Sequence, residues 1–198
     1  MSHRTLSVLR HHDDRTIPEV GTYEIDRAHT AVEFIARHMM ITKVRGRFKE
    51  FHGQIAIAEN PEDSHVAVEI ATASLDTGNS ARDTHLRSAD FFEVERYPTI
   101  TFRSTFVGEL PDGRWALMGD LTIRDTTRSV TMTVEFDGAD VSPAGDERIG
   151  FSATTEVDRE AFGLTWNEAL ETGGVLVGRT VRIELAVQAT AVLIPAVA

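Results

Sequence analysis

Apolar and polar side chains alternate along most of this chain, and this period of two residues restricts its fold more than any other feature. In the segment 65–71, Val66, Val68 and Ile70 fall on one face and the residues between them on the other. The same alternation recurs over residues 114–123, 128–136, 148–157 and 180–193. Alternation of this kind predicts β-strands with one buried face and one face in water.

Turn signals separate these runs and favour short connections between antiparallel neighbours. They are Asn60–Pro61, Pro111–Asp112–Gly113, Pro143–Ala144–Gly145 and Gly173–Gly174. Long strands joined in this way predict an all-β protein whose antiparallel sheet curls and closes, because closure removes the exposed edges. The alternation alone is also compatible with a β-sandwich. A shift of parity between Phe48 and Phe51 predicts a bulge at that point.

The segment 79–102 interrupts the alternation and predicts two short helices. Ser80 and Asp83 match a capping box, which marks the start of a helix. A second start follows at Ser88, and Pro98 ends the helical stretch because the residue before a proline avoids helical geometry. The apolar residues of the segment are Leu86, Phe91, Phe92 and Val94. These side chains need a surface to cover, so we expect the two helices to close the open end of a barrel.

The length of 198 residues suits a single domain. Residues 1–19 are polar, and we expect them to form a flexible N-terminal arm. The barrel domain is expected over residues 20–194, followed by a C-terminal tail at 195–198. No segment reaches the apolar length of a signal peptide or a transmembrane helix, so we expect a cytoplasmic protein without stable membrane insertion.

Charge and cysteine content exclude several classes of function. The formal net charge is -11, which argues against nucleic acid or an anionic membrane surface as the main partner, although a local basic patch is compatible with it. The chain has no cysteine, which excludes disulfides and thiolate metal sites.

Six segments, in order across residues 21–194, carry a resemblance to a known family. They are YEIDRAHTAVEFIARH, VRGRFKEFHG, ASLDTGNSARDTHLRSADFFEVERYPTITFRS, GDLTIRDTTRSVTMTV, FGLTWNEALETGGVLVG and VRIELAVQA. With them the chain resembles the YceI-like family of lipid- and polyisoprenoid-binding proteins. The resemblance implies an eight-stranded, antiparallel, lipocalin-like barrel whose elongated apolar pore holds a polyisoprenoid or quinone-like lipid. It implies no established catalytic residues, and a homodimer is compatible with it.

Residues of inward parity and of the helical segment are the candidates for the wall of this pore. They are Phe34, Ala36, Leu86, Phe92, Phe102, Met132, Phe151, Ala153 and Trp166. Small residues among the inward positions, such as Ala36, Ala153 and Ala189, leave volume that a lipid tail would fill. From the residues alone, a core filled by its own side chains is equally compatible, and the resemblance favours the ligand. We expect no cofactor besides a bound isoprenoid lipid.

Polar residues near the helical segment allow two interpretations. His29, Arg82, His85 and Arg87 either meet the head group of the lipid or tie the lid to the barrel wall by hydrogen bonds. A third hypothesis is a metal-dependent hydrolase or isomerase that uses His29, His38, His85 and Asp83. The sequence contains no zinc-protease helix, nucleophile elbow or phosphate-binding loop, so we expect binding without catalysis.

Overall fold

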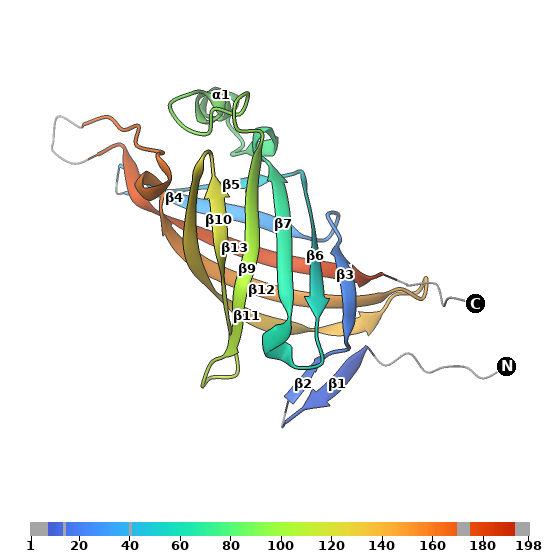
Figure 1. Cartoon of the computed structure of the whole chain (residues 1–198). Coiled ribbons are helices and arrows are strands. Elements are labelled where there is room, and N and C mark those ends of the chain that lie inside the picture. Colours follow the sequence, from blue (N-terminus) through green and yellow to red (C-terminus); the bar gives the residue numbers. More distant parts are fainter. Residues whose placement is uncertain (1–7, 14, 40, 170–174, 193–198) are drawn as a thin grey trace.

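The computed structural model describes residues 8–13, 15–39, 41–169 and 175–192, which form mostly strands (Figure 1). The strands are β1 Leu9–His12, β2 Arg15–Pro18, β3 Gly21–Ile25, β4 Ala31–His38, β5 Thr42–Phe48, β6 Phe51–Ile57, β7 His65–Ala71, β8 Leu75–Asp76, β9 Thr99–Glu109, β10 Trp115–Ile123, β11 Thr126–Val141, β12 Glu147–Asp158 and β13 Val177–Ala191. The helices are α1 Ser80–Arg87 and the 3-10 turns η1 Pro61–Asp63, η2 Thr72–Ser74 and η3 Arg159–Phe162. No helix among the described residues is long and apolar enough to cross a membrane.

Eight strands close into an antiparallel barrel, as the sequence predicts. The ring runs β12–β11–β10–β9–β7–β6–β3–β13, and β13 pairs with β12 to complete it. The last pairing is long, from Arg148 opposite Thr190 to Asp158 opposite Thr180. Closure excludes the sandwich alternative and satisfies the backbone groups at the seam between the last two long strands.

At one end of the barrel the wall continues beyond the ring as β4, β5 and β8. The N-terminal half of β13 pairs with β4, and its last residues pair with β3. The bulge predicted between Phe48 and Phe51 is wrong, because residues 49–50 connect β5 to β6 and these two strands do not pair with each other. The hydroxyl of Ser74 accepts hydrogen bonds there from the backbone N–H groups of Lys49 (3.1 Å) and Glu50 (3.0 Å).

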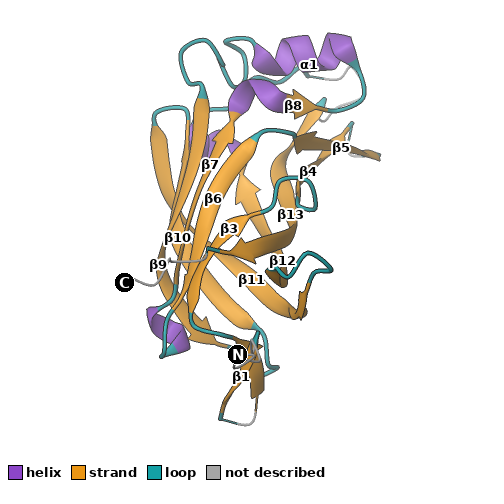
Figure 2. Cartoon of the chain, turned by 90° about the vertical axis from the view of Figure 1, so that its right-hand side faces the viewer, coloured by secondary structure: helices purple, strands orange, loops and turns teal. Residues whose placement is uncertain are grey.

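The segment between β8 and β9 crosses the same end of the barrel and contains one helix, α1, in place of the two predicted (Figure 2). The cap of α1 is Asn79, whose side chain accepts from the backbone N–H of Arg82, so the predicted capping box at Ser80 does not form. The hydroxyl of Ser88 donates to the carbonyl of His85 (2.7 Å) and thereby ends α1. Residues 88–97 then form turns, with Glu93 at a φ of 48°, outside right-handed helical geometry.

The opposite end of the barrel is covered by the hairpin β1–β2, which corrects the prediction of a flexible arm for residues 9–12 and 15–18. Arg10 fixes this hairpin by donating to the carbonyls of Ala58 (2.6 Å) and Glu59 (2.7 Å). Ile17 is only 4% exposed, and its burial gives the hairpin an apolar anchor. The remaining residues of the predicted arm at 1–7 and the predicted tail at 195–198 lie outside the described residues.

Candidate functional site

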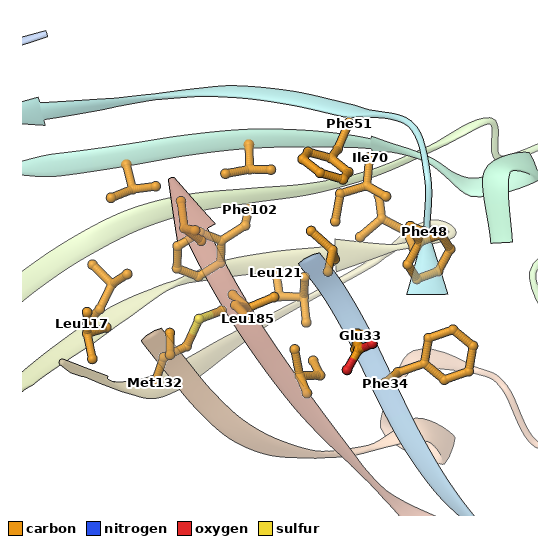
Figure 3. A pocket seen from close by; sticks show the side chains of 18 of the residues that line it. Glu33, Phe34, Phe48, Phe51, Ile70, Phe102, Leu117, Leu121, Met132 and Leu185 are labelled. Atoms are coloured by element: carbon orange, nitrogen blue, oxygen red, sulfur yellow. The ribbon is translucent and has the colours of Figure 1, made fainter. Parts of the chain in front are cut away.

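An apolar cavity runs inside the barrel from the hairpin β1–β2 to the lid segment 79–98. Its wall includes Ile17 at the hairpin end and Leu86 and Phe92 at the lid end. The space open to the centre of a water molecule is about 310 Å³. By the same measure a single water needs only about 10–15 Å³, so the inward side chains do not fill the barrel. Figure 3 shows side chains from several strands, such as Phe102 and Met132, reaching into this common space.

Eight of the nine residues predicted for the pore line this cavity. They are Phe34, Ala36, Leu86, Phe92, Phe102, Met132, Phe151 and Ala153. Phe34 can lie flat over β5 because its register partner is Gly46, where a Cβ atom would fall 2.2 Å from the Phe34 ring. Phe92 of the lid packs edge-on against Phe48 of the wall, with ring centroids 5.9 Å apart. That these eight residues contact a ligand stays a prediction.

Two residues that the sequence predicts to border open space in the pore, Trp166 and Ala189, do not border it. Trp166 does not line the cavity, because its ring packs edge-on against His85 at 4.5 Å and beside Phe91 at 5.4 Å. Ala189 is fully buried in a separate cluster with Tyr23 and Ile149, so it leaves no volume for a ligand. Trp166 therefore supports the lid, and Ala189 belongs to a packed part of the core.

Four polar residues reach the wall of the cavity, and each already has partners. Thr30 donates to the carbonyl of Gln188 (3.1 Å), and Glu33 pairs with Arg45 (2.5 Å). The hydroxyl of Ser64 accepts from the backbone N–H of Ala58 (3.0 Å). The fourth polar residue, Arg159, donates to main-chain carbonyls. Because all the other lining residues are apolar, the cavity suits a hydrocarbon chain.

Arg159 is 4% exposed and donates to main-chain carbonyls of the segment after η3 and of the start of β13. Its partners are the carbonyl oxygens of Gly178 (3.0 Å), Trp166 (3.0 Å), Val177 (3.3 Å) and Leu164. Burial lowers the pKa of this guanidinium. No signal in the sequence marks Arg159 as buried, since a charged residue after a strand resembles an ordinary solvated turn residue.

The charged residues of α1 form hydrogen bonds within the lid and to residues 73–77 that lead into it, which is compatible with the tether interpretation. Arg82 donates to the hydroxyl (2.7 Å) and carbonyl (2.9 Å) of Thr77, and Arg87 donates to the carbonyls of Ala73 and Leu75. The Nε2 atom of His85 is hydrogen-bonded to the carboxylate of Asp90 at 2.9 Å, within the lid itself. None of these three residues lines the cavity.

His29 lies apart from the lid in the turn between β3 and β4. Its ring is 2.7 Å from a carboxylate oxygen of Asp26, which also accepts from Arg148 and Gln188 (both 3.2 Å). Burial opposes ionisation of Asp26, but the hydrogen bond from His29 and the backbone N–H of Ala28 outweigh it and lower the pKa of this carboxyl. His29 is thus bonded to Asp26, and a contact of its ring with a lipid head group stays a prediction.

The metal-site hypothesis receives no geometric support from the described part of the chain. No group of three or more His, Cys, Asp or Glu residues in it is arranged to hold a metal ion. Asp83 instead accepts from the backbone N–H (2.9 Å) and the hydroxyl (2.6 Å) of Thr77. His38 sits at the end of β4, opposite Thr42.

Asp76 anchors the start of the lid and gives the fold a defined response to acid. The hydrogen bond from Lys49, the backbone N–H of Gly78 and the hydrogen bond from Arg47 lower its pKa from 3.8 to about 2. Between pH 4 and 2 the unfolded chain therefore binds the proton more readily, and the folded state loses stability as the pH falls. We expect Asp76→Asn to flatten the decline of the urea midpoint in this window.

The matched control for this prediction is Glu62→Gln, which removes an exposed carboxylate that has no side-chain partner among the described residues. It is expected to leave the slope of the urea midpoint against pH as in the wild type. An Asp76→Asn slope that equals the wild-type slope contradicts the prediction.

Comparison with known proteins agrees with this fold. The family model of the YceI-like domain matches residues 23–189. A UPF0312 protein of Staphylococcus aureus strain USA300 is 37% identical over 166 residues, which cover 82% of this chain and 93% of that protein. The crystal structure of BcnA from Burkholderia cenocepacia superposes with a TM-score of 0.73 at 22% identity, covering 83% and 98% of the two chains. A polyisoprenoid binding domain from Saccharophagus degradans gives a TM-score of 0.62 at 15% identity, covering 88% and 100%.

Proposed function

Because this chain belongs to the YceI-like domain family, we propose that it binds a long isoprenoid-type lipid inside the barrel and sequesters or carries it. The ligand class is a polyprenyl or quinone-like amphiphile, and the protein acts on it by binding, without catalysis. The observation that carries this proposal is the long apolar cavity, whose polar lining groups all have partners within the protein.

The physical chemistry of the cavity favours a hydrocarbon chain over a polar ligand. Each methylene that leaves water contributes about 0.8 kcal/mol, so a tail of many carbons offsets the ~4–15 kcal/mol that association costs. A polar ligand would meet a wall that is apolar at all but a few positions and would lose its own hydrogen bonds with water. The polyisoprenoid binding domain from Saccharophagus degradans has the same fold and supports this choice of ligand class.

Organic extraction of the purified full chain followed by mass spectrometry tests the proposed function. The expected result is a prenyl lipid near one molecule per chain, together with a raised unfolding temperature when a delipidated sample receives geranylgeraniol. An extract without lipid, together with no stabilisation by the prenyl alcohol, would contradict the proposal. Stoichiometric zinc in the same sample would instead support the hydrolase alternative.

A further inference from the structure

The segment 34–49 is strongly basic within an acidic chain. It contains five of the 20 Lys and Arg residues of the protein and none of the 31 Asp and Glu residues. These basic residues are Arg37, Lys43, Arg45, Arg47 and Lys49. The segment comprises most of β4 and all of β5, which form a hairpin at the lid end of the barrel (Figure 2).

The basic residues near the turn of this hairpin differ from those further along it. Arg45 pairs with Glu33 and Glu184, while Arg47 and Lys49 share Asp76. At the tip, by contrast, Arg37 and Lys43 are register partners, and neither side chain has a partner within the described part of the chain. Ala36 beside them lines the cavity, so alternation along the strand directs Arg37 to the outer face.

Three exposed apolar side chains lie beside this unpaired charge. Ile41, in the turn of the hairpin, is 77% exposed, which is the largest value among the exposed large hydrophobic residues described. Met39 and Val175 are each 39% exposed. The backbone N–H of Met39 donates to the carbonyl of Leu176 (2.8 Å), which brings Val175 to the same place. We call Arg37, Met39, Ile41, Lys43 and Val175 together the β4–β5 tip.

We infer that the β4–β5 tip docks on the surface of an anionic phospholipid bilayer. Two unpaired cations beside apolar side chains match the requirements of shallow insertion, in which the apolar groups enter the head-group region and the cations meet lipid phosphates. A protein partner fits less well, because the exposed apolar side chains of Met39, Ile41 and Val175 fall far short of the ~800 Å² that each side of a stable protein interface buries.

The position of the tip gives the docking a consequence for the cavity. Ala36, next to Arg37, and Val177, the register partner of His38, both line the cavity. Docking would therefore hold the lid end of the barrel against the bilayer, where a lipid enters or leaves. This role in lipid exchange rests on the proposed function, whereas the docking itself requires no bound cargo.

The net charge of -11 makes this docking local and dependent on orientation. An anionic bilayer repels the protein as a whole, but the charges that matter at contact lie within a Debye length of about 8 Å at physiological salt. The face that carries the unpaired Arg37 and Lys43 is attracted at this distance.

Vesicle co-sedimentation of the delipidated full chain tests the inference independently of its cargo. We expect binding to vesicles of phosphatidylcholine with 30% phosphatidylglycerol in ~50 mM salt, and none to pure phosphatidylcholine. Arg37→Gln/Lys43→Gln should weaken the binding by about thirtyfold, because each basic residue near such a surface contributes about fivefold in affinity. Ile41→Ser should weaken it by roughly tenfold.

Matched control variants remove two positive charges, or one exposed apolar side chain, at positions outside the β4–β5 tip. Arg27→Gln/Arg103→Gln also removes two exposed arginines, and Phe106→Ser removes a side chain of a residue that is 51% exposed on β9. Both should bind vesicles as the wild type does, with an unfolding temperature that verifies the fold of every variant. No binding by the wild type, equal binding to neutral vesicles, or equal loss in the control variants would overturn the inference. A chain that docks yet yields no lipid on extraction would contradict only the proposed function.

Discussion

Replacing Ala153 with phenylalanine is expected to abolish tight binding of an isoprenoid tail while the barrel stays folded. Ala153 lies on β12 between Val134 of β11 and Leu185 of β13, its register partners on either side. All three residues line the cavity. A phenyl ring at this position would project into the space that the tail is proposed to occupy.

The size of the effect follows from the contacts that the tail would lose. A ring that displaces about three methylene equivalents removes ~2.4 kcal/mol, which raises the Kd roughly fiftyfold. Thermal stabilisation by geranylgeraniol and the lipid content of the extracted protein measure this loss. The fold should survive because the ring enters existing space, whereas overpacking a filled core destabilises a protein by about 1–3 kcal/mol.

The control for this substitution is Thr154→Phe, which adds the same ring one residue along β12, on the exposed face. It should leave the prenyl alcohol binding of the protein unchanged. If Ala153→Phe lowers the unfolding temperature strongly and Thr154→Phe does not, then the position was already packed. A folded Ala153→Phe variant that binds as the wild type does would place the ligand elsewhere.

The strands and the pore wall could be predicted from the sequence because both depend on the same local rule. Parity along a strand decides which side chains face inward, so positions such as Phe102, Met132 and Phe151 follow from alternation. The rule fails for Trp166, which lies in the irregular segment after η3 where no parity applies. It also cannot distinguish Ala153, beside open space, from Ala189, which is packed by Tyr23 and Ile149.

The prediction of two helices in the lid fails for a second reason, because serine can occur both at the start and at the end of a helix. Serine is common at helix starts, so Ser88 predicts a new helix, yet its hydroxyl instead binds the carbonyl of His85 at the end of α1. The hairpin β1–β2 was missed because only Ile17 and Pro18 among its residues line the cavity. Its remaining composition is typical of a solvated arm.

Arg159 could not be predicted from local sequence, and its replacement should have the largest effect on stability. Its four carbonyl partners come from residues 164 to 178, which only the complete fold brings around one guanidinium. Methionine at this position matches the aliphatic stem but donates no hydrogen bond, so buried carbonyls would lose their partners. Each buried polar group left without a partner costs about 1–3 kcal/mol, and we expect Arg159→Met to lower the free energy of unfolding by ~3 kcal/mol or more.

Urea unfolding followed by intrinsic tryptophan fluorescence measures this change, with Arg96→Met as the control. Arg96 is exposed, and its ion pair with Glu93 is long at 3.9 Å, so its replacement should change the free energy of unfolding by less than about 1 kcal/mol. Arg159→Lys should fall between the two, because an ammonium offers three donors from one point and cannot span carbonyls on several sides. Equal stability of Arg159→Met and Arg96→Met would show that water replaces the guanidinium, and the cavity would then be wetter at this end than its apolar wall implies.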